Sequence, residues 1–297
     1  MNGRICRAVL VGFAVVAFCA TVAQASSEPG PSRGNNLAHV KGEAGHGKNA
    51  APLLLYHGGA VMTSGAQVTP IFWGTSWTAS SEKIGGMTMF YKGVGGTSYL
   101  GTNTEYTDSS GARVSTSVSY SGTTLIDTSA APKGAPQTSA ILAEVAKEIP
   151  NPVANGYYPV YVDTPRGNAH YCAWHSTGTV NGVTVRFGFF FNLDGDPGCD
   201  PESTSTAYSQ GVAALGNVSG HELSEMLTDP NLDAWYDASG AENSDKCAWT
   251  FGSQMVRFKN GSQWKIQGNW SNAAYNASRG YTDSAAGFVR GCIDGTN

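Results

Sequence analysis

The sequence predicts a single α+β domain in which a mixed sheet supports one central helix. Hydrophobic residues make up 41% of the 297-residue chain, which is enough to bury one core. Short segments rich in β-branched and aromatic residues recur between glycine turns. Segments with helical spacing fall between them, and no repeat of fixed period is present. Strands and helices mixed in this way predict one α+β domain, which we place at residues 51–297.

The first 25 residues have the pattern of a secretory signal peptide. Arg4 and Arg7 precede an uncharged apolar run over 8–20, and Ala23-Gln24-Ala25 is a small-residue cleavage site. The alternative is a membrane anchor, but the run is short for a spanning helix. We therefore expect residues 1–25 to be removed and the mature chain to be secreted and extracellular, with no membrane attachment.

Residues 26–50 are rich in Gly, Asn, Ser and charged residues and contain almost no large apolar side chain. This composition predicts a disordered linker or a pro-segment. His39 and His46 lie within it, and we interpret both as solvated spacer residues.

Charge and cysteine content exclude some functions. A formal charge of −4 and an isoelectric point near 5.8 argue against a nucleic-acid partner. Four cysteines remain after signal cleavage, and an even number in an oxidising compartment predicts two disulfides with three pairings open. A four-cysteine zinc site would need close C-x2-C pairs, which are absent. Our preferred pairing is sequential, Cys172–Cys199 and Cys247–Cys292.

Four segments open the predicted domain. Leu53–Tyr56 and Val68–Trp73 are apolar and bounded by glycines, which predicts strands. Residues 81–93 have mixed helical spacing. Residues 102–126 are rich in Thr, Ser, Tyr and Val, which is typical of strands and hairpins.

The second half of the domain has stronger patterns. Apolar residues of 139–149 share one helical face, and Pro150 ends that helix. Residues 157–162 and 180–193 predict strands, and the aromatic run in the second is typical of a central buried strand. Residues 206–227 predict a long helix, and strand and loop follow from Trp249.

The long helix carries the most informative motif. His221 and Glu225 are four residues apart, so a helix presents them on one face, one turn apart. This is the spacing by which H-E-x-x-H helices hold zinc, with a carboxylate here in the second place. Glu222 then takes the position of a general base that accepts a proton from metal-activated water.

Further ligands must come from another segment. Glu242 and Asp245 follow Glu225 by 17 and 20 residues. We predict Glu242 as a ligand and Asp245 as a ligand or as the acceptor that fixes the ring of His221. Cys247 would hold this loop through its disulfide. The predicted cofactor is zinc or another divalent metal.

Two alternatives compete with this interpretation. Ser219 and Glu222 match a capping box, in which Glu222 would only close a helix start. Residues 194–200 carry three aspartates that could offer oxygen ligands to calcium, although an Asx turn pinned by a disulfide explains them as well.

Two histidines lie on a predicted strand before the aromatic run. His170 and His175 are five residues apart, so they face opposite sides of a strand and one at most joins a given site. We predict His175 as a catalytic group that stabilises an oxyanion, with packing beside a disulfide as the alternative.

Six segments between Ala51 and Cys292 carry a family resemblance: Tyr56–Met62, Ile71–Gly74, Cys172–Trp174, Asn192–Gly195, Thr228–Pro230 and Gly291–Cys292. They resemble the secreted phosphate-induced protein 1 family, which includes the plant EXORDIUM proteins. The resemblance implies an extracellular protein tied to the cell wall, in a family without settled chemistry.

Glu222 and Glu225 are not carried by that resemblance. His221 and Glu222 are similar to the matching pair of thermolysin-like metallopeptidases, whereas Glu225 stands where those enzymes have histidine. This second resemblance implies a zincin-like fold with a central metal-site helix.

The sequence thus predicts a secreted metal-dependent hydrolase, a zinc-type metallopeptidase acting on extracellular protein or peptide. The alternative is a non-catalytic protein that binds cell-wall polysaccharide through exposed aromatic rings, and a third interpretation is structural calcium binding. The rings available for sugar stacking are Trp73, Trp77, Trp235, Trp264 and Trp270.

Overall fold

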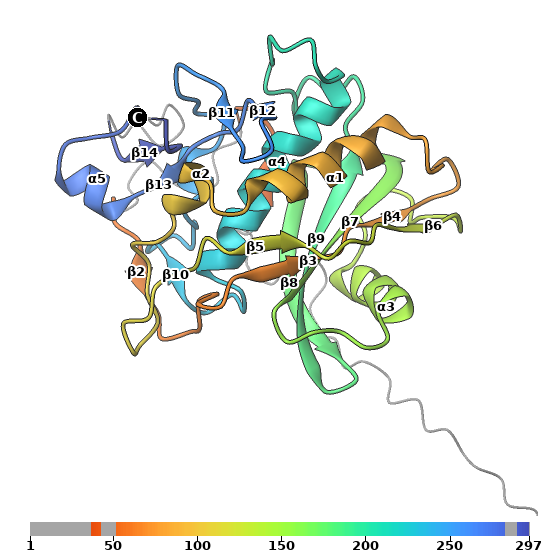
Figure 1. Cartoon of the computed structure of the whole chain (residues 1–297), viewed down its shortest axis with the longest axis horizontal. Helices are drawn as coiled ribbons and strands as arrows, with labels where there is room; N and C mark the ends of the chain where they lie inside the picture. The colour runs from red at the N-terminus through yellow and green to blue at the C-terminus, as the bar shows by residue number, and fades with distance from the viewer. Residues whose placement is uncertain (1–36, 43–51, 283–289, 297) are drawn as a thin grey trace, which may run out of the picture.

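The computed structural model describes residues 37–42, 52–282 and 290–296, and Figure 1 shows their arrangement. The predicted signal peptide and His46 lie outside these residues. Within them the chain is a mixed α/β protein built on one large mixed sheet. The prediction of a mixed sheet combined with helices is therefore confirmed.

Three long strands form the centre of the sheet. β7 (Gly156–Pro165) runs parallel to β9 (Val183–Asn192), and β9 pairs antiparallel with β8 (Tyr171–Val180). The main path through the sheet is β1-β8-β9-β7-β3-β5, and β4 and β6 extend it beside β7. The shorter strands are β1 (Leu37–His39), β3 (Ala66–Val68), β4 (Ile71–Trp73), β5 (Val118–Tyr120) and β6 (Leu125–Asp127).

β8 and β9 are joined by a two-residue turn, Asn181-Gly182. Both residues have positive φ, 48° and 81°. This is the type I′ geometry that asparagine followed by glycine favours, because its twist matches that of the flanking strands. The turn fixes the β8–β9 register, which places His175 opposite Gly188.

Helices cover both faces of the sheet. α4 (Gln210–Thr228) packs against β8 and β9 and against α1 (Glu82–Val94), as Figure 1 shows. α3 (Thr138–Glu148) packs on the other face. Its Leu142 lies so close to Gly178 of β8 that a Cβ on that glycine would contact it. Residues 175 and 178 of one strand point to opposite faces, so His175 faces α4.

α4 begins at a capping residue and is buried along its length. The hydroxyl of Ser209 accepts a hydrogen bond from the N–H of Val212, and every residue from Gly211 to Thr228 is buried. Glycine permits this close packing, since a Cβ on Gly216 would lie 2.4 Å from the ring of Trp264. A helix buried on all sides must find partners for each of its polar side chains.

A carboxyl-terminal layer surrounds the far side of α4. It consists of short paired strands, one 3₁₀ turn and one short helix, as expected from the strand-and-loop pattern after Trp249. Its elements are η1 (Asp245–Cys247), β11 (Val256–Arg257), β12 (Gln263–Trp264), β13 (Asn269–Trp270), α5 (Asn272–Asn276) and β14 (Cys292–Ile293). The remaining short elements are β2 (Leu55–Tyr56), β10 (Trp235–Tyr236), which pairs with β2, and α2 (Ser98–Gly101).

Both disulfides form as predicted. Cys172 is bonded to Cys199, and Cys247 to Cys292. All four cysteines are therefore used, which rules out the four-cysteine zinc site. None of the helices in the described ranges is long and apolar enough to cross a bilayer.

Three sequence predictions are corrected. The prediction for residues 102–126 is corrected in part: β5 and β6 supply strands, but they pair in parallel with strands from elsewhere in the chain, and antiparallel pairing within the range is the single bridge Thr107–Arg113. The predicted strand 68–73 is two strands, since Pro70 has no N–H to continue the ladder. Residues 37–39, expected within a disordered linker, form β1 against β8.

Candidate metal centre

Two residues of the predicted motif face one another on α4. Nε2 of His221 lies 2.9 Å from Oε1 of Glu225, and both side chains are fully buried. Helical spacing of four residues sets this proximity. Since Ser219 and Glu222 lie in the middle of α4 and Ser209 is its N-cap, the capping-box alternative is excluded.

Asp245 joins the pair from the segment that follows α4. Its Oδ1 lies 3.5 Å from Nε2 of His221, and its backbone N–H donates to Oε1 of Glu225 at 3.1 Å. Oδ2 of Asp245 accepts the backbone N–H of Glu242 at 3.0 Å. Asp245 begins η1, and the Cys247–Cys292 disulfide anchors that turn. Backbone donors therefore orient both carboxylates.

His175 and Glu242 lie on the other side of Glu225. Nε2 of His175 is 3.3 Å from Oε2 of Glu242 and 3.7 Å from Oε2 of Glu225. The two oxygens of Glu225 thus face two different histidines. His175 and Glu242 are buried, and both belong to a group of potential ligand atoms that includes Glu225.

Sequence reasoning placed Glu242 beside His221. In the structure the carboxylate beside His221, apart from that of Glu225, belongs to Asp245, while Glu242 approaches the site through His175. His175, predicted as an oxyanion stabiliser, lies among the candidate ligands. The structure thus gathers His175, His221, Glu225, Glu242 and Asp245 into one buried cluster, which we call the acidic–histidine cluster.

Several buried atoms of the cluster have no hydrogen-bond partner. They are Nε2 of His221, Oε2 of Glu225 and Oδ1 of Asp245, together with Oε2 of the neighbouring Glu222. The contact of His221 with Glu225 is close, yet it lacks hydrogen-bond geometry. Leaving buried polar atoms unpaired costs free energy, so native structures rarely do so without an ion, a water or a functional reason.

The electrostatics of the cluster are dominated by several carboxylates buried close together. Burial and the charge of Asp245 together raise the pKa of Glu225 to about 8, against the opposing effect of His221. Burial alone would lower the pKa of His221, but Glu225 and Asp245 outweigh it and raise that pKa well above its usual range.

The neighbouring groups respond to the same environment. Burial raises the pKa of Glu222, and burial with the charges of Asp229 and Glu225 raises the pKa of Glu242. Burial and the proximity of His221 lower the pKa of His175 to about 3, so its ring is neutral. A neutral imidazole is the form that binds a metal ion.

Glu222 has a separate environment at the edge of the cluster. It is fully buried, and its Oε1 accepts a hydrogen bond from the backbone N–H of Ala38 in β1 at 3.2 Å. A backbone amide of the chain's own amino-terminal segment therefore covers the predicted general base.

Two further residues were missed by sequence reasoning. The side-chain amide of Gln267 contacts Nδ1 of His221 and so orients the ring. The hydroxyl of Tyr157 is buried without a hydrogen-bond partner, and the charges of Glu222 and Glu225 add to burial in raising its pKa. Neither residue lies near the motif in sequence, so no local pattern could have identified them.

Two of the three aspartates proposed for calcium are paired with cations of the chain itself, and the third, Asp200, accepts the backbone N–H of Glu202. Asp194 lies 2.6 Å from Lys83, and Asp196 lies 2.6 Å from Arg166. Oδ1 of Asp196 also accepts the N–H of Gly198, which is the expected turn geometry. These contacts favour the disulfide-pinned turn over a calcium site.

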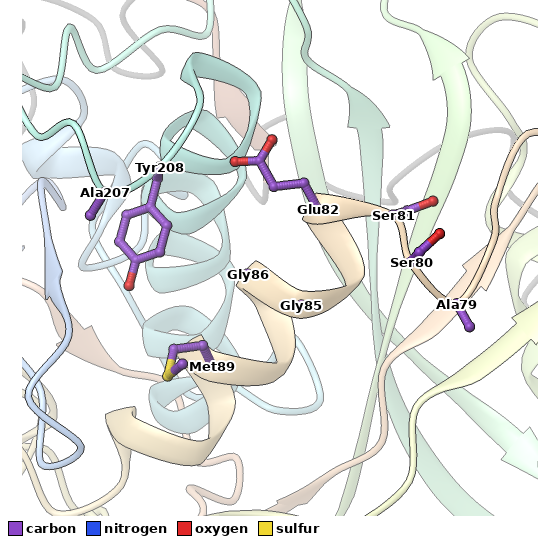
Figure 2. A pocket seen from close by; sticks show the side chains of 9 residues that line it. All are labelled: Ala79, Ser80, Ser81, Glu82, Gly85, Gly86, Met89, Ala207 and Tyr208. Atoms are coloured by element: carbon purple, nitrogen blue, oxygen red, sulfur yellow. The ribbon is translucent and has the colours of Figure 1, made fainter.

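Two cavities lie outside the cluster. One of about 400 Å³ opens beside the first turns of α1, where Figure 2 shows Tyr208 and Met89 flanking Gly85 and Gly86. Another of about 350 Å³ lies next to α5. No member of the cluster lines either cavity.

No family model matches the chain, and neither a curated protein nor a solved structure is detectably similar to it. The functional assignment therefore depends on the geometry of the cluster.

Proposed function

We propose that the protein is a secreted metal-dependent hydrolase, a peptidase with a zincin-like site on α4. The observation that carries the proposal is the convergence of the buried side chains of His221, Glu225 and Asp245. Nε2 of His221 and Oδ1 of Asp245 have no hydrogen-bond partner, and Oε1 of Glu225 lies 2.9 Å from that nitrogen. The two disulfides are consistent with an extracellular location.

The donor set fits a divalent cation. Zinc bonds nitrogen and oxygen at about 2.0–2.2 Å, so tetrahedral ligand atoms lie roughly 3.3 Å apart. Nε2 of His221 lies 2.9 Å from Oε1 of Glu225 and 3.5 Å from Oδ1 of Asp245. These separations bracket the expected one, and zinc accepts nitrogen and carboxylate ligands. Calcium would require more oxygen ligands and no imidazole, which makes it the less suitable ion.

Metal ligation at Nε2 of His221 sets a condition on Gln267. Nδ1 must then carry the proton and donate it to an oxygen, so the amide of Gln267 must present Oε1 to the ring. The oxygen and nitrogen of an amide exchange places by a 180° flip, and here the flip would exchange the bond that Oε1 accepts from the N–H of Trp249 at 3.2 Å for one from His221. Such an outer hydrogen bond is typical of metal-binding histidines.

A cation held by this set would polarise a substrate carbonyl and lower the pKa of water beside it. In this proposal Glu222 would accept the proton of that water and return it to the departing nitrogen. The raised pKa of Glu222 favours this proton transfer, because a carboxylate with an ordinary pKa would hold the proton of the water less readily. Tyr157 offers a hydroxyl donor for the charge that develops on oxygen.

The test combines metal content with turnover. We expect purified mature protein to contain bound zinc and to hydrolyse members of a quenched-fluorescence peptide library. H221A should lose the metal and E222Q should keep it, while E222Q loses about 10²- to 10⁴-fold in turnover. E82Q, at an exposed glutamate in the first turn of α1 outside these groups of potential ligands, is the matched control with unchanged values. Full activity in E222Q would contradict the mechanism.

The polysaccharide alternative loses part of its support. Trp77, Trp264 and Trp270 are buried in the core and offer no stacking face. Trp73 and Trp235 are half-buried, and each donates its indole N–H within the chain. The positions of these five rings therefore support a cell-wall glycan partner less strongly than the sequence does.

A further inference from the structure

The amino-terminal strand β1 lies at the edge of the sheet beside the acidic–histidine cluster. It pairs antiparallel with β8, with Leu37 opposite Trp174 and Ala38 opposite Ala173. His175, a candidate metal ligand, is the next residue along β8. β1 also packs against α4 and η1, the elements that carry His221, Glu225 and Asp245.

The backbone of β1 reaches the predicted general base. The N–H of Ala38 donates to Oε1 of Glu222 at 3.2 Å, and this peptide unit is enclosed, since Ala38 is 2% exposed. In peptide hydrolysis the general base returns its proton to the nitrogen of the broken bond. The nitrogen of Ala38 therefore stands where the nitrogen of a bound substrate would stand.

Contacts beyond the strand hold the same segment in place. The N–H groups of Val40 and Lys41 donate to the carbonyls of His170 and Gly198 at 3.2 and 2.9 Å. The indole of Trp249 donates to the carbonyl of His39 at 2.8 Å. Most of these contacts are made by the backbone of the segment, so a different peptide could make them as well.

We propose that the edge of β8 beside Glu222 is a peptide-binding groove, and that residues 37–41 occupy it as an internal inhibitor. The ligand class is an extended peptide added as an antiparallel strand. The tight burial of Ala38 requires a small residue at the position beside Glu222. The role given to Glu222 rests on the proposed function, but the occupancy of the groove does not.

The test releases the segment from a folded full-length chain. A recognition site for a specific protease is inserted within 43–51 of the mature protein, in the E222Q background so that no bound peptide is hydrolysed. Both disulfides lie beyond residue 51, so the cut frees only the amino-terminal piece. The probe is a fluorescein-labelled peptide with the sequence of residues 37–42, followed by anisotropy.

Before cutting, the tether keeps the segment at a high effective concentration, so the probe should not bind. After cutting and dialysis, we expect at least tenfold more bound probe. N-methylation of the probe at Ala38 removes the donor to Glu222 and should weaken binding about tenfold or more. N-methylation at Gly42, beyond the strand, is the matched control and should change little.

A cut chain that keeps its native circular dichroism, releases the segment and fails to bind the probe would overturn the groove. Retention of the segment against a hundredfold excess of probe would equally show a structural strand. If cutting unfolds the chain, the A38P variant of the uncut protein is tested instead. Proline lacks the N–H that donates to Glu222, so the segment should leave the groove and the probe should bind. If the probe binds and the parent protein, which retains Glu222, does not hydrolyse it, the proposed hydrolase function is contradicted while the proposed peptide-binding groove is supported.

Discussion

Nε2 of His221 and Oε1 of Glu225 lie 2.9 Å apart inside α4's buried face, and the contact lacks hydrogen-bond geometry. Oε1 of Glu225 accepts the backbone N–H of Asp245, whereas Nε2 of His221 has no hydrogen-bond partner. Oδ1 of Asp245, also without a partner, lies 3.5 Å from the same nitrogen, so three potential ligand atoms from α4 and η1 lie within 4.8 Å of one another.

The carboxylates of the cluster should contribute unequally to metal binding. D245N removes an oxygen that faces Nε2 of His221, whereas E242Q changes a residue that faces His175. We expect D245N to lower zinc affinity more than E242Q, and at least tenfold relative to the parent protein. Competition with a chromophoric chelator measures both. Equal losses in the two variants would show that His175 and His221 share one ion.

Tyr157→Phe should separate catalysis from stability. The hydroxyl of Tyr157 is buried without a partner, so its removal leaves the free energy of unfolding unchanged or raises it by about 1 kcal/mol. If this hydroxyl stabilises developing charge, kcat falls about 10²- to 10³-fold with little change in KM. Steady-state kinetics and urea unfolding provide the two readouts. A stable variant with unchanged kcat would exclude this role.

The packing of α4 can be tested at a glycine. A Cβ on Gly216 would lie 2.4 Å from the ring of Trp264, so G216A should lower the free energy of unfolding by about 1–3 kcal/mol. Gly85 in α1 has open space around its Cα, so G85A is the matched control. It should raise the free energy of unfolding by about 0.5–1 kcal/mol, because alanine favours helix. Chemical unfolding of both variants checks the pair, and destabilisation by G85A would contradict this account.

A pH dependence is expected from α3. Burial, assisted by Asp127, raises the pKa of Glu144 to about 7, above its ordinary value of 4.5. The folded protein then holds this proton between about pH 4.5 and 7 while the unfolded chain releases it. The contribution of Glu144 to the free energy of unfolding therefore falls as pH rises through this window.

E144Q should remove that contribution. Relative to the parent, the free energy of unfolding of E144Q should therefore increase from pH 5 to pH 8. Other buried carboxylates change both proteins equally, so the difference isolates Glu144. A constant difference across this range would show that Glu144 ionises normally in the folded state.

Local patterns in the sequence predicted the elements whose cause is local. The spacing of His221 and Glu225 placed both on one face of a helix, and the structure has that helix over Gln210–Thr228. The order of the cysteines predicted both disulfides.

Features that depend on distant contacts were not predictable in this way. β1 was missed because its polar neighbours in sequence resemble a linker, and its pairing with β8 and its contacts with Glu222 and Trp249 come from distant parts of the chain. Gln267 and Tyr157 reach the cluster through the tertiary fold, as does the choice between Asp245 and Glu242 beside His221. Residues 102–126 have strand-like composition, but their pairing partners lie elsewhere in the chain.

The turn at Asn181-Gly182 has an effect at a distance from itself. It sets the register of β8 against β9, and therefore which residues of β8 lie beside the cluster. Side chains alternate between the two faces of a strand, so one residue added to or deleted from the turn would reverse the faces of β8. His175 would then leave α4's side of the sheet, and the indole of Trp174 or the hydroxyl of Ser176 would replace its imidazole. The length of a surface hairpin loop thus determines which residue of β8 lies in the buried centre, and changing that length would alter the centre as directly as replacing one of its side chains.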